Sequence, residues 1–163
     1  AFASSGRGTL LVHASVIKHD GRGYLFLGKS GTGKSTHSSL WLQHIEGSEL
    51  LNDDNPVVRV DEIGAVVYGS PWSGKRPVYM NVNYPIGGIA AIVQNKENSI
   101  RRESAPIAFS IMLSSCSTLK FDKKIHMDVC TTITDILGKT AIHTLSCRAD
   151  KEAAELSSRT FGI

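Results

Sequence analysis

The pattern of apolar and polar positions predicts a chain that is rich in strands before residue 96. Short runs of apolar and β-branched residues, bounded by Gly, Asp, Asn or Pro, are typical of strands. Such runs occupy 9–17, 24–28, 49–54, 57–60, 65–69, 87–95 and 141–147. The turn sequence at 19–23 predicts a hairpin between the first two runs. Because 24–28 is almost entirely apolar, we expect this strand to be buried on both faces.

Helical spacing of apolar residues appears in three further segments. They are 34–45, 105–138 with a break near Phe121, and 150–161. Gly47 is expected to end the first helix, and Asp150 is expected to cap the last one. Together the elements predict an α/β fold in which helices flank a mixed β-sheet.

Two stretches show neither the strand pattern nor the helical spacing of apolar residues. The segment 70–79 is predicted to be irregular, because Pro71 and Pro77 are incompatible with regular structure. The mixed charges of 96–103 predict a solvated turn.

Length and composition fit one globular domain over residues 1–163, although the absence of an initiator Met leaves a trimmed chain with a further domain open. Hydrophobic residues make up 41% and charged residues 20%, which suffices for a core. A net charge of +3 is too small to indicate nucleic-acid binding. We expect no membrane span and no secretory signal, because no run of 18 apolar residues and no signal-peptide pattern occurs. Cys116, Cys130 and Cys147 lack CxxC spacing, which predicts reduced thiols in a cytoplasmic protein.

The stretch GKSGTGKST, residues 28–36, carries the chemistry. It matches the Walker A pattern G-x-x-x-x-G-K-[ST] of phosphate-binding loops, and it lies between a predicted strand and a predicted helix, as the motif requires. Glycines allow the backbone to turn its N–H groups toward phosphate oxygens at the helix N-terminus. We expect Lys34 to bridge the β- and γ-phosphates of ATP and Ser35 to hold Mg²⁺. The nucleotide-binding residues are then Gly28, Lys29, Ser30, Gly31, Thr32, Gly33, Lys34, Ser35 and Thr36.

Asp53 and Asp54 end a predicted buried strand, 25 and 26 residues after Gly28. A parallel strand beside 24–28 would bring both carboxylates to the edge of the sheet where ligands bind. Adjacent carboxylates push their pKa values apart, so one can stay ionised on Mg²⁺ while the other takes a proton from a hydroxyl. The alternative is an Asx turn of structural importance only. His13 lies on the strand predicted to pair with 24–28, and a lone histidine there is more often structural.

These three features together resemble the phosphate-loop kinases that include HPr kinase/phosphorylase and ATP-dependent phosphoenolpyruvate carboxykinase. Both families place a histidine on the strand before the loop and paired aspartates after it. The segment LFLGKSGTGKST is similar to the carboxykinase loop, whereas the spacings resemble those of HPr kinase. The match covers residues 11–60. It implies a P-loop kinase core of this type, in which a hairpin replaces the first strand–helix unit.

The resemblance also implies roles for the site residues. Asp53 would be the base, Asp54 would bind metal or orient phosphates, and His13 would sit near the γ-phosphate or a second metal. The implied activity is ATP-dependent transfer of the γ-phosphate to a hydroxyl, on a protein serine or a small molecule. Homo-oligomers are expected because HPr kinases form hexamers.

The chain also departs from both families. HPr kinases carry a Glu-Ile-Arg-Gly-Leu-Gly type segment downstream, whereas 81–89 here contains neither Glu nor Arg. This leaves a nucleotide-binding regulator without transfer activity as an alternative. Carboxykinase activity is disfavoured, because the chain is short and no equivalent of the oxaloacetate-binding arginines is found.

Two other groups of residues carry weaker signals. The segment 70–79 is interpreted as a substrate or phosphate-covering loop, in which Lys75 and Arg76 meet transition-state charge and Trp72 stacks on the base or lines a pocket. A solvated loop with one anchored aromatic is the alternative. His37 and His44 are predicted to share one face of the first helix, but no third metal ligand is evident.

Overall fold

The computed structural model of the protein describes residues 2–72, 74, 76, 78 and 80–163. Its elements follow the predicted order closely. The helices are η1 (Phe2–Arg7, a 3₁₀ helix), α1 (Lys34–His44), α2 (Ala105–Ser115), α3 (Lys123–Lys139) and α4 (Lys151–Thr160). The strands are β1 (Thr9–Leu11), β2 (Ala14–His19), β3 (Arg22–Leu27), β4 (Glu49–Asn52), β5 (Val57–Val60), β6 (Ala65–Tyr68), β7 (Asn83–Gln94), β8 (Ser99–Arg102) and β9 (Ile142–Cys147).

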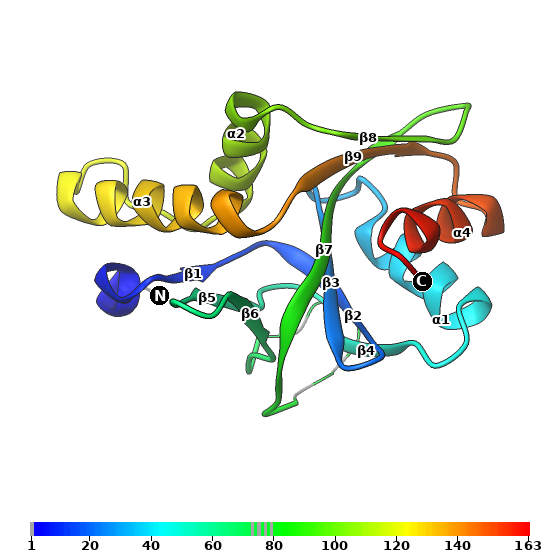
Figure 1. The fold of residues 1–163 in the computed structure, drawn as a ribbon, viewed down its shortest axis with the longest axis horizontal. Coiled ribbons are helices and arrows are strands. Elements are labelled where there is room, and N and C mark those ends of the chain that lie inside the picture. Colours follow the sequence, from blue (N-terminus) through cyan, green and yellow to red (C-terminus); the bar gives the residue numbers. More distant parts are fainter. Residues whose placement is uncertain (1, 73, 75, 77, 79) are drawn as a thin grey trace.

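The sheet is mixed, and β7 joins its two parts (Figure 1). The first residues of β7 pair antiparallel with β6, which continues through β5 to β1. The rest of β7 runs parallel to β3 on one side and to β9 on the other. Beyond β3 lie β2 and then β4, whereas β8 covers the outer edge of β9. The strands β3, β4 and β7 point the same way, so their C-terminal ends lie at the same edge of the sheet.

Helices cover both faces of the sheet, with α1 and α4 on one face and α2 and α3 on the other (Figure 1). The sequence of β3 is apolar because its successive side chains pack into the cores on the two opposite faces of the sheet. Leu25 and Leu27 belong to the core cluster that includes residues of α2 and α3, whereas Tyr24 and Phe26 belong to the cluster around Trp41 of α1. Across the described residues, no helix combines the length and the apolar character needed to cross a bilayer.

Three expectations about strands need correction. The run 9–17 forms two strands, β1 and β2, because its first part pairs with β5 and its second part with β3. The segment 96–103 contains β8, which pairs antiparallel with β9 instead of forming only a solvated turn. Finally, β4 is not beside β3: β2 lies between them, antiparallel to both, so β3 and β4 point the same way one strand apart.

Candidate active site

The glycine-rich loop connects β3 to α1, as predicted. Gly31 has a φ of 83° and Gly33 a φ of 101°. Residues with a Cβ rarely adopt these angles, so glycine is required for this path of the backbone. Thr32 stabilises the turn, because its backbone N–H and its hydroxyl both donate to Lys29 O, at 3.2 and 2.8 Å. The loop thus has the shape of a cradle that opens at the N-terminus of α1.

The first turn of α1 offers free hydrogen-bond donors to this cradle. The first intrahelical bond runs from His37 N–H to Gly33 O, so the N–H groups of Lys34, Ser35 and Thr36 have no acceptor within the helix. Gly33 is the N-cap residue, and no side chain caps the helix. Free N–H groups and the positive end of the helix dipole favour an anion at this point.

Lys34 is folded back onto the loop. Its Nζ donates to Gly28 O at 2.8 Å and to Lys29 O at 3.3 Å, and only 8% of the residue is exposed. Burial lowers the pKa of Lys34, while the charges of Asp54 and Asp53 oppose this shift. The ammonium group is therefore buried close to two carboxylates and can turn toward an anion in the cradle.

Asp53 is held in a buried network at the end of β4. Its side chain is fully buried, and Ser15 donates a hydrogen bond to Oδ1 at 3.0 Å. Ser15 Oγ also lies 2.7 Å from Ser38 Oγ, which ties the carboxylate to α1. Arg76 contacts both carboxylate oxygens, with Nη2 3.3 Å from Oδ1 and Nε 3.4 Å from Oδ2. The Asp53 carboxyl group therefore has a hydrogen-bond donor on each of its oxygens.

Asp54 and His13 form the more exposed half of the site. His13 Nε2 lies 3.5 Å from Asp54 Oδ1, and the two side chains are 41% and 33% exposed. Partial burial, followed by the charge of Lys34, lowers the pKa of His13, whereas Asp54 raises it. His13 follows β1 and precedes β2, so the prediction that it lies within the strand is wrong. At this junction its backbone N–H donates to Ser115 O at 2.7 Å.

A cleft of about 430 Å³ brings the predicted residues together. It is lined by His13, Ser30, Gly31, Gly33, Lys34, Ser35, Thr36, Asp53, Asp54, Gly74 and Gln94. The two carboxylates that follow β4, the imidazole before β2 and the loop after β3 therefore line one cleft. The intervening β2 does not prevent this convergence, because β3 and β4 end on the same side of the sheet. Among the described residues, no group of three or more His, Cys, Asp or Glu side chains is arranged to hold a metal ion alone.

Gly74, in the segment after β6, lines this cleft, and Arg76 of the same segment contacts Asp53. In addition to Asp53, Arg76 Nη2 donates to Ser35 O at 2.8 Å, which links the segment to the first turn of α1. Trp72 is half-exposed, and Trp72 O accepts a hydrogen bond from Asn52 at 3.1 Å. Lys75 lies outside the described residues, so its predicted role stays a prediction.

Three side chains of the site were not predicted. Ser15 bonds Asp53, Asn52 anchors the segment after β6, and Gln94 Nε2 donates to Gly31 O at 3.2 Å. Asn52 and Gln94 were detectable in principle, because each stands at the end of a predicted strand on the side where ligands bind. Ser15 gives no such signal in the sequence.

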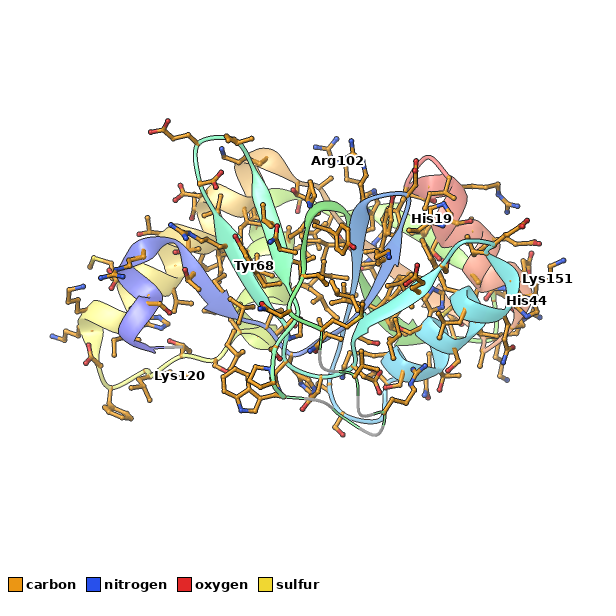
Figure 2. All side chains as sticks on the ribbon, turned by 90° about the horizontal axis from the view of Figure 1, so that it is seen from below. His19, His44, Tyr68, Arg102, Lys120 and Lys151 are labelled. Atoms are coloured by element: carbon orange, nitrogen blue, oxygen red, sulfur yellow. The ribbon has the colours of Figure 1, made fainter. Side chains whose placement is uncertain are left out.

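The two histidines of α1 stand seven residues apart, which places them on one face of the helix as predicted, but their surroundings differ. His37 is buried, with 2% of the residue exposed. His44 is exposed and lies at the outer end of the molecule in Figure 2.

Comparisons with known proteins add little to this geometry. No protein-family model matches the chain. No curated protein matches it either. Among solved structures, the chain is similar to the Hpr(Ser) kinase/phosphatase from Coxiella burnetii, with 16% sequence identity and a TM-score of 0.39, over 93% of this chain and 97% of that chain. A structural similarity this weak does not support an inference about function, so the roles of the site residues are inferred from their own geometry.

Proposed function

We propose that the protein is an ATP-dependent phosphotransferase that moves the γ-phosphate of ATP to a hydroxyl group, on a protein serine or a small molecule. The observation that carries this proposal is the convergence of Lys34, Ser35, Asp53, Asp54 and His13 on one cleft. Each type of group has a known use in phosphoryl transfer, where positioning and charge stabilisation supply most of the catalysis.

The residues of the cleft fit a nucleoside triphosphate and Mg²⁺. The unpaired N–H groups at the start of α1 and the Lys34 ammonium would hold phosphate oxygens. The Ser35 hydroxyl and the Asp54 carboxylate would hold Mg²⁺, which in such sites is bound by few protein ligands together with phosphates. When bound, Mg²⁺ would offset the negative charge of the phosphates.

Asp53 is the proposed base that accepts the proton of the attacking hydroxyl. In the present arrangement Arg76 faces both of its carboxylate oxygens. Arg76 must therefore move aside before Asp53 can meet a substrate. Once released, its guanidinium would be available to the charge that develops on the transferred phosphoryl group. His13 lies beside Asp54 and would also be close to the transferred phosphoryl group.

A nucleotide-binding regulator without transfer activity is the second candidate. The contact between Arg76 and Asp53 favours it, because a base that remains paired in this way cannot accept a proton. The segment 81–89 also lacks the Glu and Arg of HPr kinases.

Incubation with γ-labelled ATP and Mg²⁺ separates these two functions. The acceptors are serine, small alcohols and the proteins of a cell extract. The proposal expects label on a hydroxyl-bearing acceptor, and expects Asp53→Asn to abolish that label while ATP binding persists. Label found only as slowly released phosphate would favour the regulator.

A further inference from the structure

A second cavity, of about 430 Å³, lies between the glycine-rich loop, the second half of β7 and the C-terminal turn of α2. It is lined by His13, Gly28, Lys29, Ser30, Thr32, Ala91, Ile92, Ile111, Ser114 and Ser115. His13 and Ser30 also line the cleft that contains Asp53. The two spaces therefore adjoin at His13, close to the place proposed for the terminal phosphate of a bound nucleotide.

Backbone hydrogen bonds hold the walls of this cavity in place. His13 N–H donates to Ser115 O at 2.7 Å, which ties the junction before β2 to the end of α2. Just beyond α2, Ser117 N–H donates to Leu11 O at 3.0 Å. Ile92 of the central strand β7 is buried and contributes to an apolar floor. The fold thus fixes the imidazole, the floor and the end of α2 relative to one another.

Lys29 is the one residue of this lining that carries a formal charge near pH 7. Burial, followed by the charge of Lys34, lowers the pKa of His13, so its imidazole is neutral at that pH. The Lys29 carbonyl accepts hydrogen bonds within the loop from Thr32 and Lys34. The residue is exposed, and its side chain forms no ion pair with any described residue. Since no Asp or Glu is among the described residues of the lining, the cavity favours an anion over a cation.

We propose that this cavity binds the phosphate acceptor, and that the acceptor is a small hydroxyl compound with a carboxylate group. The inference rests on the proposed function, because it needs a triphosphate in the adjoining cleft. A volume of about 430 Å³ lies in the lower part of the range for small-molecule sites. The carboxylate pairs with Lys29, the carbon chain covers Ile92, and the hydroxyl passes His13 to enter the cleft.

The transfer step is a displacement at the γ-phosphorus. The acceptor oxygen forms a bond to this phosphorus while its bond to the oxygen that bridges the β- and γ-phosphates breaks. The hydroxyl proton passes to Asp53, and ADP leaves. Pairing with Lys29 reduces the repulsion between the acceptor carboxylate and the triphosphate. A serine within a protein has no carboxylate of its own, so Lys29 gives it no such advantage.

Three acceptors of equal chain length test this charge preference. They are 3-hydroxypropionate, 3-hydroxypropionamide and 3-amino-1-propanol, which carry the same primary hydroxyl and differ at the other end. With γ-labelled ATP and Mg²⁺, the wild-type protein is expected to show a kcat/KM about fivefold higher for the carboxylate than for the amide. The ammonium compound should give the lowest value. The difference should lie mainly in KM, because Lys29 contacts a part of the acceptor that does not react.

A negative charge added to the cavity should reverse this order. Ser114 is exposed at the end of α2 and lines the cavity, so Ser114→Glu places a carboxylate there. We expect the kcat/KM of this variant for 3-hydroxypropionate to fall about fivefold, and 3-amino-1-propanol to become the preferred acceptor. Calorimetry should show an ATP affinity close to that of the wild-type protein. Ser110→Glu is the matched control, because it adds the same charge one turn earlier on α2, at an exposed residue outside this lining.

Two results would overturn the inference and leave the proposed function intact. One is an equal kcat/KM for the three acceptors, or an order that Ser114→Glu changes no more than Ser110→Glu does. The other is label on proteins of a cell extract with none on 3-hydroxypropionate. Binding of ATP without transfer to any acceptor would instead refute the proposed phosphotransferase, and the acceptor site with it.

Discussion

Asp53 and Arg76 illustrate how the function of a residue depends on its contacts. The Asp53 carboxylate is fully buried and faces Ser15 and Arg76, whereas Asp54 is one-third exposed beside His13. Adjacent aspartates thus occupy different environments, which is the condition for a division of roles between base and metal ligand.

Substitution of the proposed base should affect chemistry and spare binding. Asp53→Asn keeps the shape of the side chain, replaces one acceptor oxygen with an NH2 donor, and removes its ability to take a proton. We expect the transfer rate to fall by about 10²-fold or more, with ATP affinity nearly unchanged. Rates with labelled ATP and affinities from calorimetry measure the two effects. Asp20→Asn, at an exposed turn, is the matched control. Transfer at the wild-type rate by Asp53→Asn would refute the base assignment.

Lys34 should act mainly on nucleotide binding. Its buried ammonium already contacts two loop carbonyls, and it would exchange them for phosphate oxygens. Lys34→Ala is expected to weaken ATP binding about tenfold or more, since charged hydrogen bonds contribute roughly 1.5–3 kcal/mol. Lys120→Ala is the control, because Lys120 lies at the periphery of the molecule in Figure 2. Unchanged affinity of Lys34→Ala would exclude the loop as the phosphate site.

His37 should make stability depend on pH. Its pKa falls from 6.5 to about 4 on burial. Between these values the unfolded chain binds a proton that the folded protein does not bind. The free energy of unfolding should therefore rise with pH across this window, by about 3 kcal/mol in total.

Urea unfolding at several pH values measures this contribution. His37→Asn should flatten the dependence between pH 4 and 6.5, and the matched control His44→Asn, at the exposed end of α1, should retain it. Equal slopes for the wild-type protein and His37→Asn would contradict the assignment to His37.

At the scale of elements, α4 depends on its first turn. Asp150 Oδ1 accepts from Ala153 N–H at 3.0 Å, which confirms the predicted cap, and it also accepts from Asn98 of the β7–β8 turn. Asp150→Ala should lower the free energy of unfolding by about 1 kcal/mol or more, whereas Asp150→Asn should keep most of the cap. Urea unfolding checks both variants. An equal loss for the two would show that charge, and not capping, is what matters there.

The elements of the site were predictable where their signal is local. The loop between β3 and α1 follows from its glycines and flanking strand and helix, and the break between α2 and α3 follows from their periodicity. The position of β4 was not predictable, because its pairing with β2 is set by contacts distant in sequence. The strand β8 was not predicted because it is a polar, charged edge strand, in which Ile100 is the one apolar residue that packs against the core. The contact of Arg76 with Asp53 depends on an irregular segment, whose path no periodicity encodes.

At the scale of the whole molecule, the sheet assembles the site from segments far apart in the chain. The two strands β3 and β4 end on one side, the junction before β2 adds His13, and the segment after β6 adds Arg76. Neither the glycine loop nor the paired aspartates would define a phosphotransferase site alone. Their common cleft is what relates the loop to the proposed chemistry.

A crystal structure with a non-hydrolysable ATP analogue and Mg²⁺ tests this convergence most directly. The account predicts phosphates in the loop at the start of α1, the metal on Ser35 and Asp54, and the terminal phosphate facing Asp53 and His13, with Arg76 displaced from Asp53. An analogue bound elsewhere, or bound with its terminal phosphate turned away from both aspartates, would contradict the account.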